Sequence, residues 1–189
     1  MKKLKIKNRN NQNVDVLIEE TDTPRGLVFV MHGLGGFKDQ LHIRVFRSAF
    51  KERGYTVVSF DTTNTIGESD GKYKDATITN YYEDLEDVIE WAKTQPWYNE
   101  PFCMAGHSVG GFCTAFYAEN HSSKIEALAP ISTVVSGRLT LEAGPKEEVE
   151  NWKSSGWLIQ ESLSKPGVIK RLKWNVSEDS LKYDLLPLA

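Results

Sequence analysis

Phe102-Cys103-Met104-Ala105-Gly106-His107-Ser108-Val109-Gly110-Gly111 is the segment that restricts the architecture of this chain most. Its leading apolar residues predict a short buried strand, and the apolar spacing over residues 112–118 predicts a helix directly behind it. A serine flanked by glycines at such a junction is typical of a tight strand-to-helix turn that raises the hydroxyl above a sheet. A chance Gly-Ser-Gly spacing in a loop would not explain why both flanks fit. We therefore predict that Ser108 is a nucleophile.

The segments before and after this turn alternate between the two kinds of periodicity. Apolar runs predict strands over residues 4–6, 14–18, 26–31, 55–60, 102–105 and from about 125 to 135. Helical spacing is found over residues 41–50 and 82–92, with Asn80 and Glu83 as a predicted capping pair for the second helix. Alternating strands and helices predict an α/β fold with a mostly parallel sheet, preceded by an antiparallel hairpin over residues 4–18.

Composition limits the classes of partner. A net charge of −3 argues against a nucleic-acid partner held by a basic face. No apolar run is long enough to span a bilayer and no apolar leader is found, so we expect no membrane partner and a cytoplasmic location. Cys103 and Cys113 are expected to be small buried residues, not redox or metal groups. We expect no cofactor and no metal.

Three motifs in this order resemble the α/β-hydrolase superfamily. They are His32-Gly33-Leu34-Gly35-Gly36 after a buried strand, Phe60-Asp61 with Gly67-Glu68-Ser69-Asp70-Gly71, and Gly106-His107-Ser108-Val109-Gly110-Gly111. Over residues 1 to about 134 the chain is similar to bacterial cinnamoyl or feruloyl esterase-like carboxylesterases. It departs from them at Asn64-Thr65-Ile66, where many relatives carry a Gly-His pair, and this bears on substrate more than on fold.

The resemblance implies a role for three residues. Ser108 matches the nucleophile, and the backbone N–H groups of Leu34 and Val109 match the two donors that stabilise an oxyanion. The implied reaction is cleavage of a small-molecule carboxylic ester through an acyl-enzyme on Ser108. Thioesterase or peptidase chemistry at the same site is an alternative, and so is a non-catalytic ligand-binding or interaction protein on a hydrolase scaffold.

The expected general base is missing from the sequence pattern. Only His32, His42, His107 and His121 are present, and none is a convincing base for Ser108. In the superfamily the order is serine, then acid, then histidine on later loops. We therefore expect these 189 residues to be the amino-terminal portion of a longer hydrolase and to be inactive alone. Glu178, Asp179 and Asp184 are not assigned as the acid.

The resemblance also predicts an organisation for the carboxyl-terminal part. Residues 1–135 would form the incomplete core, residues 136–184 a cap-like insertion (the cap segment), and residues 185–189 the start of the next core segment. The carboxyl-terminal strands of the fold would be missing. Trp152, Trp157 and Trp174 are expected either to line an acyl or aryl pocket or to pack the cap segment onto the core. The apolar run 127–131 would become an exposed sheet edge, which favours self-association.

Overall fold

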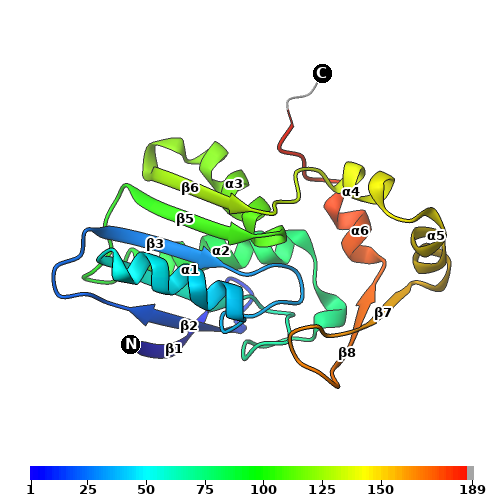
Figure 1. Cartoon of the computed structure of the whole chain (residues 1–189), viewed down its shortest axis with the longest axis horizontal. Coiled ribbons are helices and arrows are strands. Elements are labelled where there is room, and N and C mark those ends of the chain that lie inside the picture. Colours follow the sequence, from blue (N-terminus) through cyan, green and yellow to red (C-terminus); the bar gives the residue numbers. More distant parts are fainter. Residues whose placement is uncertain (187–189) are drawn as a thin grey trace.

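A computed structural model of the chain describes residues 1–186 and contains one six-stranded mixed sheet (Figure 1). The strand order is β1-β2-β4-β3-β5-β6. The antiparallel pairs are β1 with β2 and β2 with β4, and β4, β3, β5 and β6 run parallel. The strands are β1 (Lys2–Lys7), β2 (Asn13–Glu19), β3 (Gly26–Met31), β4 (Tyr55–Asp61), β5 (Phe102–His107) and β6 (Ile125–Ile131). The predicted mostly parallel sheet with an antiparallel hairpin at its start is confirmed.

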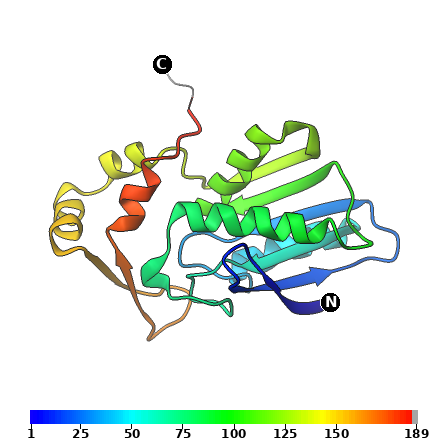
Figure 2. The ribbon, with the colours of Figure 1, turned by 180° about the vertical axis from the view of Figure 1, so that it is seen from behind.

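Helices cover both faces of this sheet. Helix α1 (Leu41–Glu52) lies on one face, and α2 (Ile78–Ala92) and α3 (Val109–Asn120) lie on the other, as the view from behind shows (Figure 2). Short 3₁₀ turns, η1 (Tyr73–Asp75) and η2 (Ser122–Lys124), occur in the connections before α2 and β6. Since central parallel strands are covered on both faces, β3 and β4 are almost wholly buried.

The predicted helices are found, but the predicted cap of the second is wrong. Helix α1 buries Ile43 and Arg47 and packs Phe46 and Phe50 against the core, whereas Leu41 and Val45 are 74% and 56% exposed. Helix α2 is capped by Thr77, whose side chain accepts a hydrogen bond from the Asn80 N–H, so Asn80 lies inside the helix. Thr77 was overlooked because Asn80 offered a second plausible cap three residues later.

The sheet ends at β6 within the described part of the chain. This strand pairs only with β5, all of its residues are exposed or half-exposed, and it ends at Ile131 instead of near residue 135. Pro130 has no N–H group to donate, which an edge strand tolerates because one side of its ladder is unpaired. The prediction that residues 127–131 form a sheet edge is confirmed.

The cap segment lies beyond the carboxyl end of the sheet (Figure 1). It contains α4 (Gly137–Ala143), α5 (Lys146–Ser155), the antiparallel hairpin β7 (Trp157–Glu161) and β8 (Ile169–Lys173), and α6 (Asn175–Ser180). Leu172 and Val176 join the main apolar core, and Asp179 accepts hydrogen bonds from the N–H and the hydroxyl of Thr79, each at 2.8 Å. The division into core, cap segment and next core segment stays a prediction, and residues 187–189 of that last part lie outside the described residues.

Two further observations concern the cysteines and the lengths of the helices. Cys103 and Cys113 are both buried and unpaired, as expected. In residues 1–186, every helix is too short or too polar to reach across a bilayer.

Candidate active site

Ser108 occupies a strained turn between β5 and α3. Its φ of 55° and ψ of −120° lie in a region that residues with side chains seldom adopt. Its N–H donates to the Ile131 carbonyl at 2.9 Å, which ties the turn to the end of β6. A Cβ added at Gly106 would lie 2.2 Å from the Gly110 oxygen, and one added at Gly110 would lie 2.3 Å from the His32 oxygen. Only glycine fits at these two positions, so the glycines around Ser108 make the turn possible.

The glycine-rich loop after β3 lies against this turn. A Cβ added at Gly33 would lie 3.1 Å from Ser108 Cβ, and the Gly35 N–H donates to the Tyr81 hydroxyl at 3.0 Å. Among the described residues, the N–H groups of Leu34 and Val109 have no hydrogen-bond acceptor. Val109 is the first residue of α3, where the helix itself supplies no acceptor. The structure therefore brings Leu34, Ser108 and Val109 to one place with two N–H groups available.

His32 holds the loop and is fully engaged in doing so. Its Nε2 accepts from the Thr62 N–H at 3.1 Å, which leaves the proton on Nδ1 to be donated to the Gly33 carbonyl at 2.8 Å. The ring is fully buried, and burial lowers the pKa of His32 below its ordinary value. With both ring nitrogens engaged, His32 holds the loop in place and is not available as a base for Ser108.

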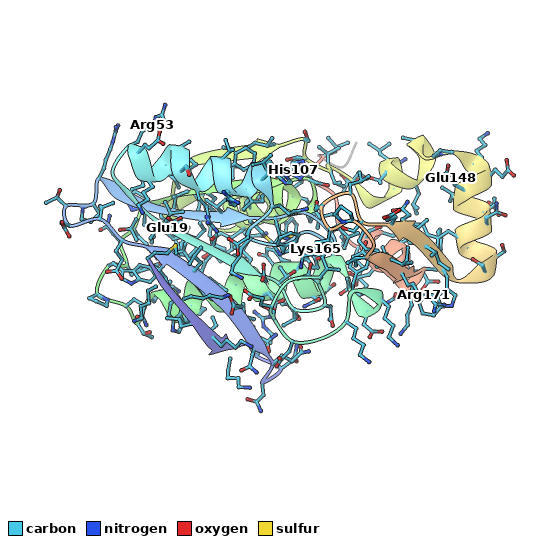
Figure 3. All side chains as sticks on the ribbon, turned by 60° about the horizontal axis from the view of Figure 1, so that its bottom comes forward. Glu19, Arg53, His107, Glu148, Lys165 and Arg171 are labelled. Atoms are coloured by element: carbon cyan, nitrogen blue, oxygen red, sulfur yellow. The ribbon has the colours of Figure 1, made fainter. Side chains whose placement is uncertain are left out.

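The other histidines are not joined to Ser108 either. The His42 and His107 rings pack with centroids 4.5 Å apart, and burial, with His107 nearby, lowers the pKa of His42. His107 lies near the junction of core and cap segment (Figure 3). His121 packs on Tyr117 with ring centroids 4.3 Å apart. Within residues 1–186 no hydrogen bond joins an imidazole to the Ser108 hydroxyl.

The late carboxylates have other partners. Asp184 accepts from the Ser136 hydroxyl at 2.8 Å and from the Leu186 N–H, and these hydrogen bonds lower its pKa. Asp179 binds Thr79 on α2. Neither forms a chain of hydrogen bonds to a histidine, so the described residues do not assemble a Ser-His-acid triad.

Lys38 and three carboxylates form an ion cluster that follows the glycine-rich loop, and the sequence patterns did not predict it. Lys38 is 1% exposed, and its Nζ lies 2.8 Å from carboxylate oxygens of Asp15, Asp61 and Glu68. These carboxylates are close enough to hold a cation such as a metal ion, but the lysine ammonium already fills that role. Burial opposes the charge of Lys38, yet the three carboxylates raise its pKa. The available signal was a lysine two positions after the last glycine of the loop, but its three carboxylate partners come from distant strands and loops.

A cavity of about 340 Å³ opens at Ser108. Leu34 and Val109 also line it, and the cap segment supplies much of the remaining wall, including Trp152. Trp174 instead packs edge-to-face on Trp152 at 5.2 Å between centroids, and Trp157 stacks with Arg171, so only one of the three tryptophans lines this cavity. A larger hollow of about 610 Å³ lies between α5 and β7. Since Ser108 does not line that hollow, the smaller cavity is the candidate substrate site.

Comparison with known families agrees with this geometry. The family model described as X-Pro dipeptidyl-peptidase (S15 family) matches residues 4–171. The chain belongs to this family. It is a hydrolase of the α/β-hydrolase superfamily, and the proteins that it is similar to include a peptidase family, a thioesterase and, by structure, an esterase.

Two relatives of this S15 family member are longer proteins, and the chain aligns with only part of each. It is 26% identical over 140 residues to the bovine mitochondrial palmitoyl-protein thioesterase ABHD10, covering 72% of this chain and 43% of the relative. It is 32% identical over 95 residues to an uncharacterized 31.7 kDa protein of Escherichia coli, covering 50% of this chain and 32% of the relative. The chain thus spans less than half the length of these relatives.

Solved structures show the same fold for this S15 family member. Est1E from Butyrivibrio proteoclasticus with bound ferulic acid superposes with a TM-score of 0.79 at 20% identity, covering 96% of this chain and 72% of Est1E. Mouse α/β-hydrolase domain-containing protein 10 superposes with a TM-score of 0.71 at 19% identity, covering 95% and 69%. The α/β-hydrolase fold and the resemblance to feruloyl esterase-like proteins are confirmed.

Proposed function

We propose that this chain carries the nucleophile and the oxyanion-binding half of a serine hydrolase that cleaves a carboxylic ester. Ser108 Oγ attacks the ester carbonyl carbon and gives up its proton to a base, and the Leu34 and Val109 N–H groups stabilise the resulting oxyanion. Expulsion of the alcohol leaves an acyl group on Ser108, and water then releases the acid. The observation that carries the proposal is the strained Ser108 turn packed against a loop with two available N–H groups.

The cavity favours an ester over the peptide named by the family. Removing a dipeptide from a chain end requires a site for the free amino-terminal ammonium, which calls for a carboxylate. Among the described residues, the only charged side chain that lines the cavity is that of Lys170, a cation. A thioester differs only in its leaving group, and the proposed site would accept it by the same steps.

We further propose that the 189 residues alone turn over slowly or not at all. Serine needs an imidazole to take its proton, and no histidine ring bonds to Ser108 within residues 1–186. The site would then bind ester or acid without completing the cycle. The alternative of a non-catalytic ligand-binding protein draws on this same observation.

A fluorophosphonate probe separates these possibilities, because it reports nucleophile geometry without requiring turnover. We expect slow labelling, with a bond from Ser108 Oγ to phosphorus and loss of fluoride, mapped by mass spectrometry of the digested protein. Ser108→Ala should abolish labelling, and Ser154→Ala, a change on the exposed face of α5, should leave it unaltered. A folded protein that is never labelled but still binds ligand would favour the non-catalytic alternative. Rapid ester turnover that Ser108→Ala removes would show that a base is already in place.

A further inference from the structure

The β7–β8 hairpin presents two pairs of side chains to the cavity at Ser108. Leu158 pairs across the strands with Leu172, and Gln160 pairs with Lys170. All four line the cavity. Because alternate residues of a strand share a face, this face has an apolar pair followed by a polar, charged pair toward the hairpin tip.

Among the described residues that line the cavity, Lys170 alone is charged. Apart from Lys170, the described residues that line the cavity are apolar or neutral, and they include Tyr73, Trp152 and Gln160. The Lys170 ammonium lies 5.6 Å from the centroid of the Tyr73 ring, which is itself part of the wall. The charge therefore faces the same space as Ser108.

The neighbouring cations are bound elsewhere or face away from the cavity, whereas among the described residues Lys170 has only the Tyr73 ring as a partner. Lys173 forms a salt bridge with Asp75, Lys165 donates to the Ile66 carbonyl at 2.7 Å, and Arg171 lies over Trp157 at 4.9 Å on the other face of the hairpin. Figure 3 labels Lys165 where the cap segment meets the core and Arg171 at the outer margin of the hairpin. In the part of the chain that the structure describes, no carboxylate pairs with the Lys170 ammonium. Lys170 is half-buried, and a lysine of this kind gains most from an anionic partner that enters the cavity.

We propose that Lys170, with Gln160 beside it, binds a carboxylate on the ligand of this cavity. The ligand is then an ester with two distinct ends: a carbonyl at Ser108, an apolar stretch against Leu158 and Leu172, and an ionised carboxylate at the hairpin. The conclusion that this ligand is a substrate rests on the proposed function. Binding of an anion by Lys170 is independent of the proposed function.

Equilibrium binding to the full chain tests the proposed anion site without requiring turnover. The background is Ser108→Ala, and the probes are the monomethyl and dimethyl esters of one straight-chain dicarboxylic acid, titrated by calorimetry. We expect the monoester to bind more tightly than the diester. Lys170→Met should weaken monoester binding about tenfold, as expected for loss of one charge-assisted hydrogen bond, and should leave diester binding unchanged. Lys170→Arg should restore the preference for the monoester.

Arg171→Met is the matched control, since Arg171 is the next residue on the same strand and points to the other face. It should change neither affinity. The proposal is overturned if Lys170→Met weakens both esters equally, because Lys170 would then only brace the hairpin on Tyr73. It is also overturned if Arg171→Met has the same effect, or if the chain binds neither ester. Fluorophosphonate labelling of Ser108 is scored separately, so failure of the nucleophile and failure of the anion site give different results.

Discussion

Gly33 packs closely against the His107–Ser108 turn, although 75 positions separate Gly33 and Ser108 along the chain. A Cβ placed on Gly33 would lie 3.0 Å from the His107 carbonyl oxygen and 3.1 Å from Ser108 Cβ. This contact fixes the distance between the loop that offers the Leu34 N–H and the turn that offers Ser108 and the Val109 N–H. The proposed chemistry depends on that spacing, because an N–H donor stabilises an oxyanion only within hydrogen-bonding distance.

Gly33→Ala should slow fluorophosphonate labelling of Ser108 about tenfold, since the added methyl pushes the loop away from the turn. The labelling rate is measured by mass spectrometry. Gly26→Ala is a matched control at the other end of β3, where an added Cβ would meet the Tyr55 ring at the same 3.0 Å. It should affect stability without changing the labelling rate. Equal slowing by both variants would contradict a specific role for the Gly33 contact.

His32→Ala should lower the free energy of unfolding by about 3 kcal/mol, because it leaves a cavity and strips the buried Gly33 carbonyl and Thr62 N–H of their partner. Burial lowers the pKa of His32 in the folded protein. Its contribution to stability is therefore complete above the unfolded-state pKa of about 6.5 and is lost as the pH falls through the lower folded-state pKa. Chemical denaturation from pH 4 to 8 measures both effects. If His32 were the base, the variant would lose labelling while keeping its stability.

Asp179→Asn should loosen the cap segment and lower stability at pH 7 by about 1–2 kcal/mol, because Asp179 joins α6 to Thr79 through charge-assisted hydrogen bonds. Burial works against ionisation of Asp179, but the Lys182 ammonium and the Thr79 donors outweigh it and lower the pKa. The stabilisation is thus present above about pH 4 and disappears as the pH falls through the folded-state pKa. Unfolding measured from pH 2 to 6 should show a shallower acid loss for the variant. Glu178→Gln, a change at the exposed neighbour, should leave the wild-type pH dependence in place.

The isolated chain should self-associate through β6, because this strand offers an unpaired ladder edge with an apolar run. Sedimentation velocity over a range of concentrations tests this proposal. Leu128→Lys should reduce association by placing a charge on the edge strand, whereas Leu163→Lys adds the same charge at a fully exposed position in the cap segment and should not. A concentration-independent monomer would contradict the proposal.

Local patterns were enough to predict most of the core. The buried runs at residues 26–31 and 55–60 and the glycines around Ser108 are constrained by neighbours in sequence, and periodicity and turn geometry report such constraints directly. Local reasoning did not decide which apolar residues of α1 are buried, because that depends on where the sheet lies: Ile43 is buried, whereas Leu41 and Val45 are exposed. It also missed Lys38, whose burial depends on three carboxylates brought in from other segments.

The amino-acid order was therefore sufficient for the α/β fold and for Ser108 in its strand-to-helix turn, because both depend on short-range backbone geometry. Leu34 and Val109 as the proposed N–H donors came from the resemblance to the α/β-hydrolase superfamily. Folding in three dimensions was needed to show that Trp152 but neither Trp157 nor Trp174 lines the cavity, that His32 has both ring nitrogens engaged, and that Lys170 brings a single charge to the space at Ser108. Those outcomes depend on which face of a hairpin or loop meets the core. That choice is made by contacts between residues far apart in the sequence, so no local pattern records it.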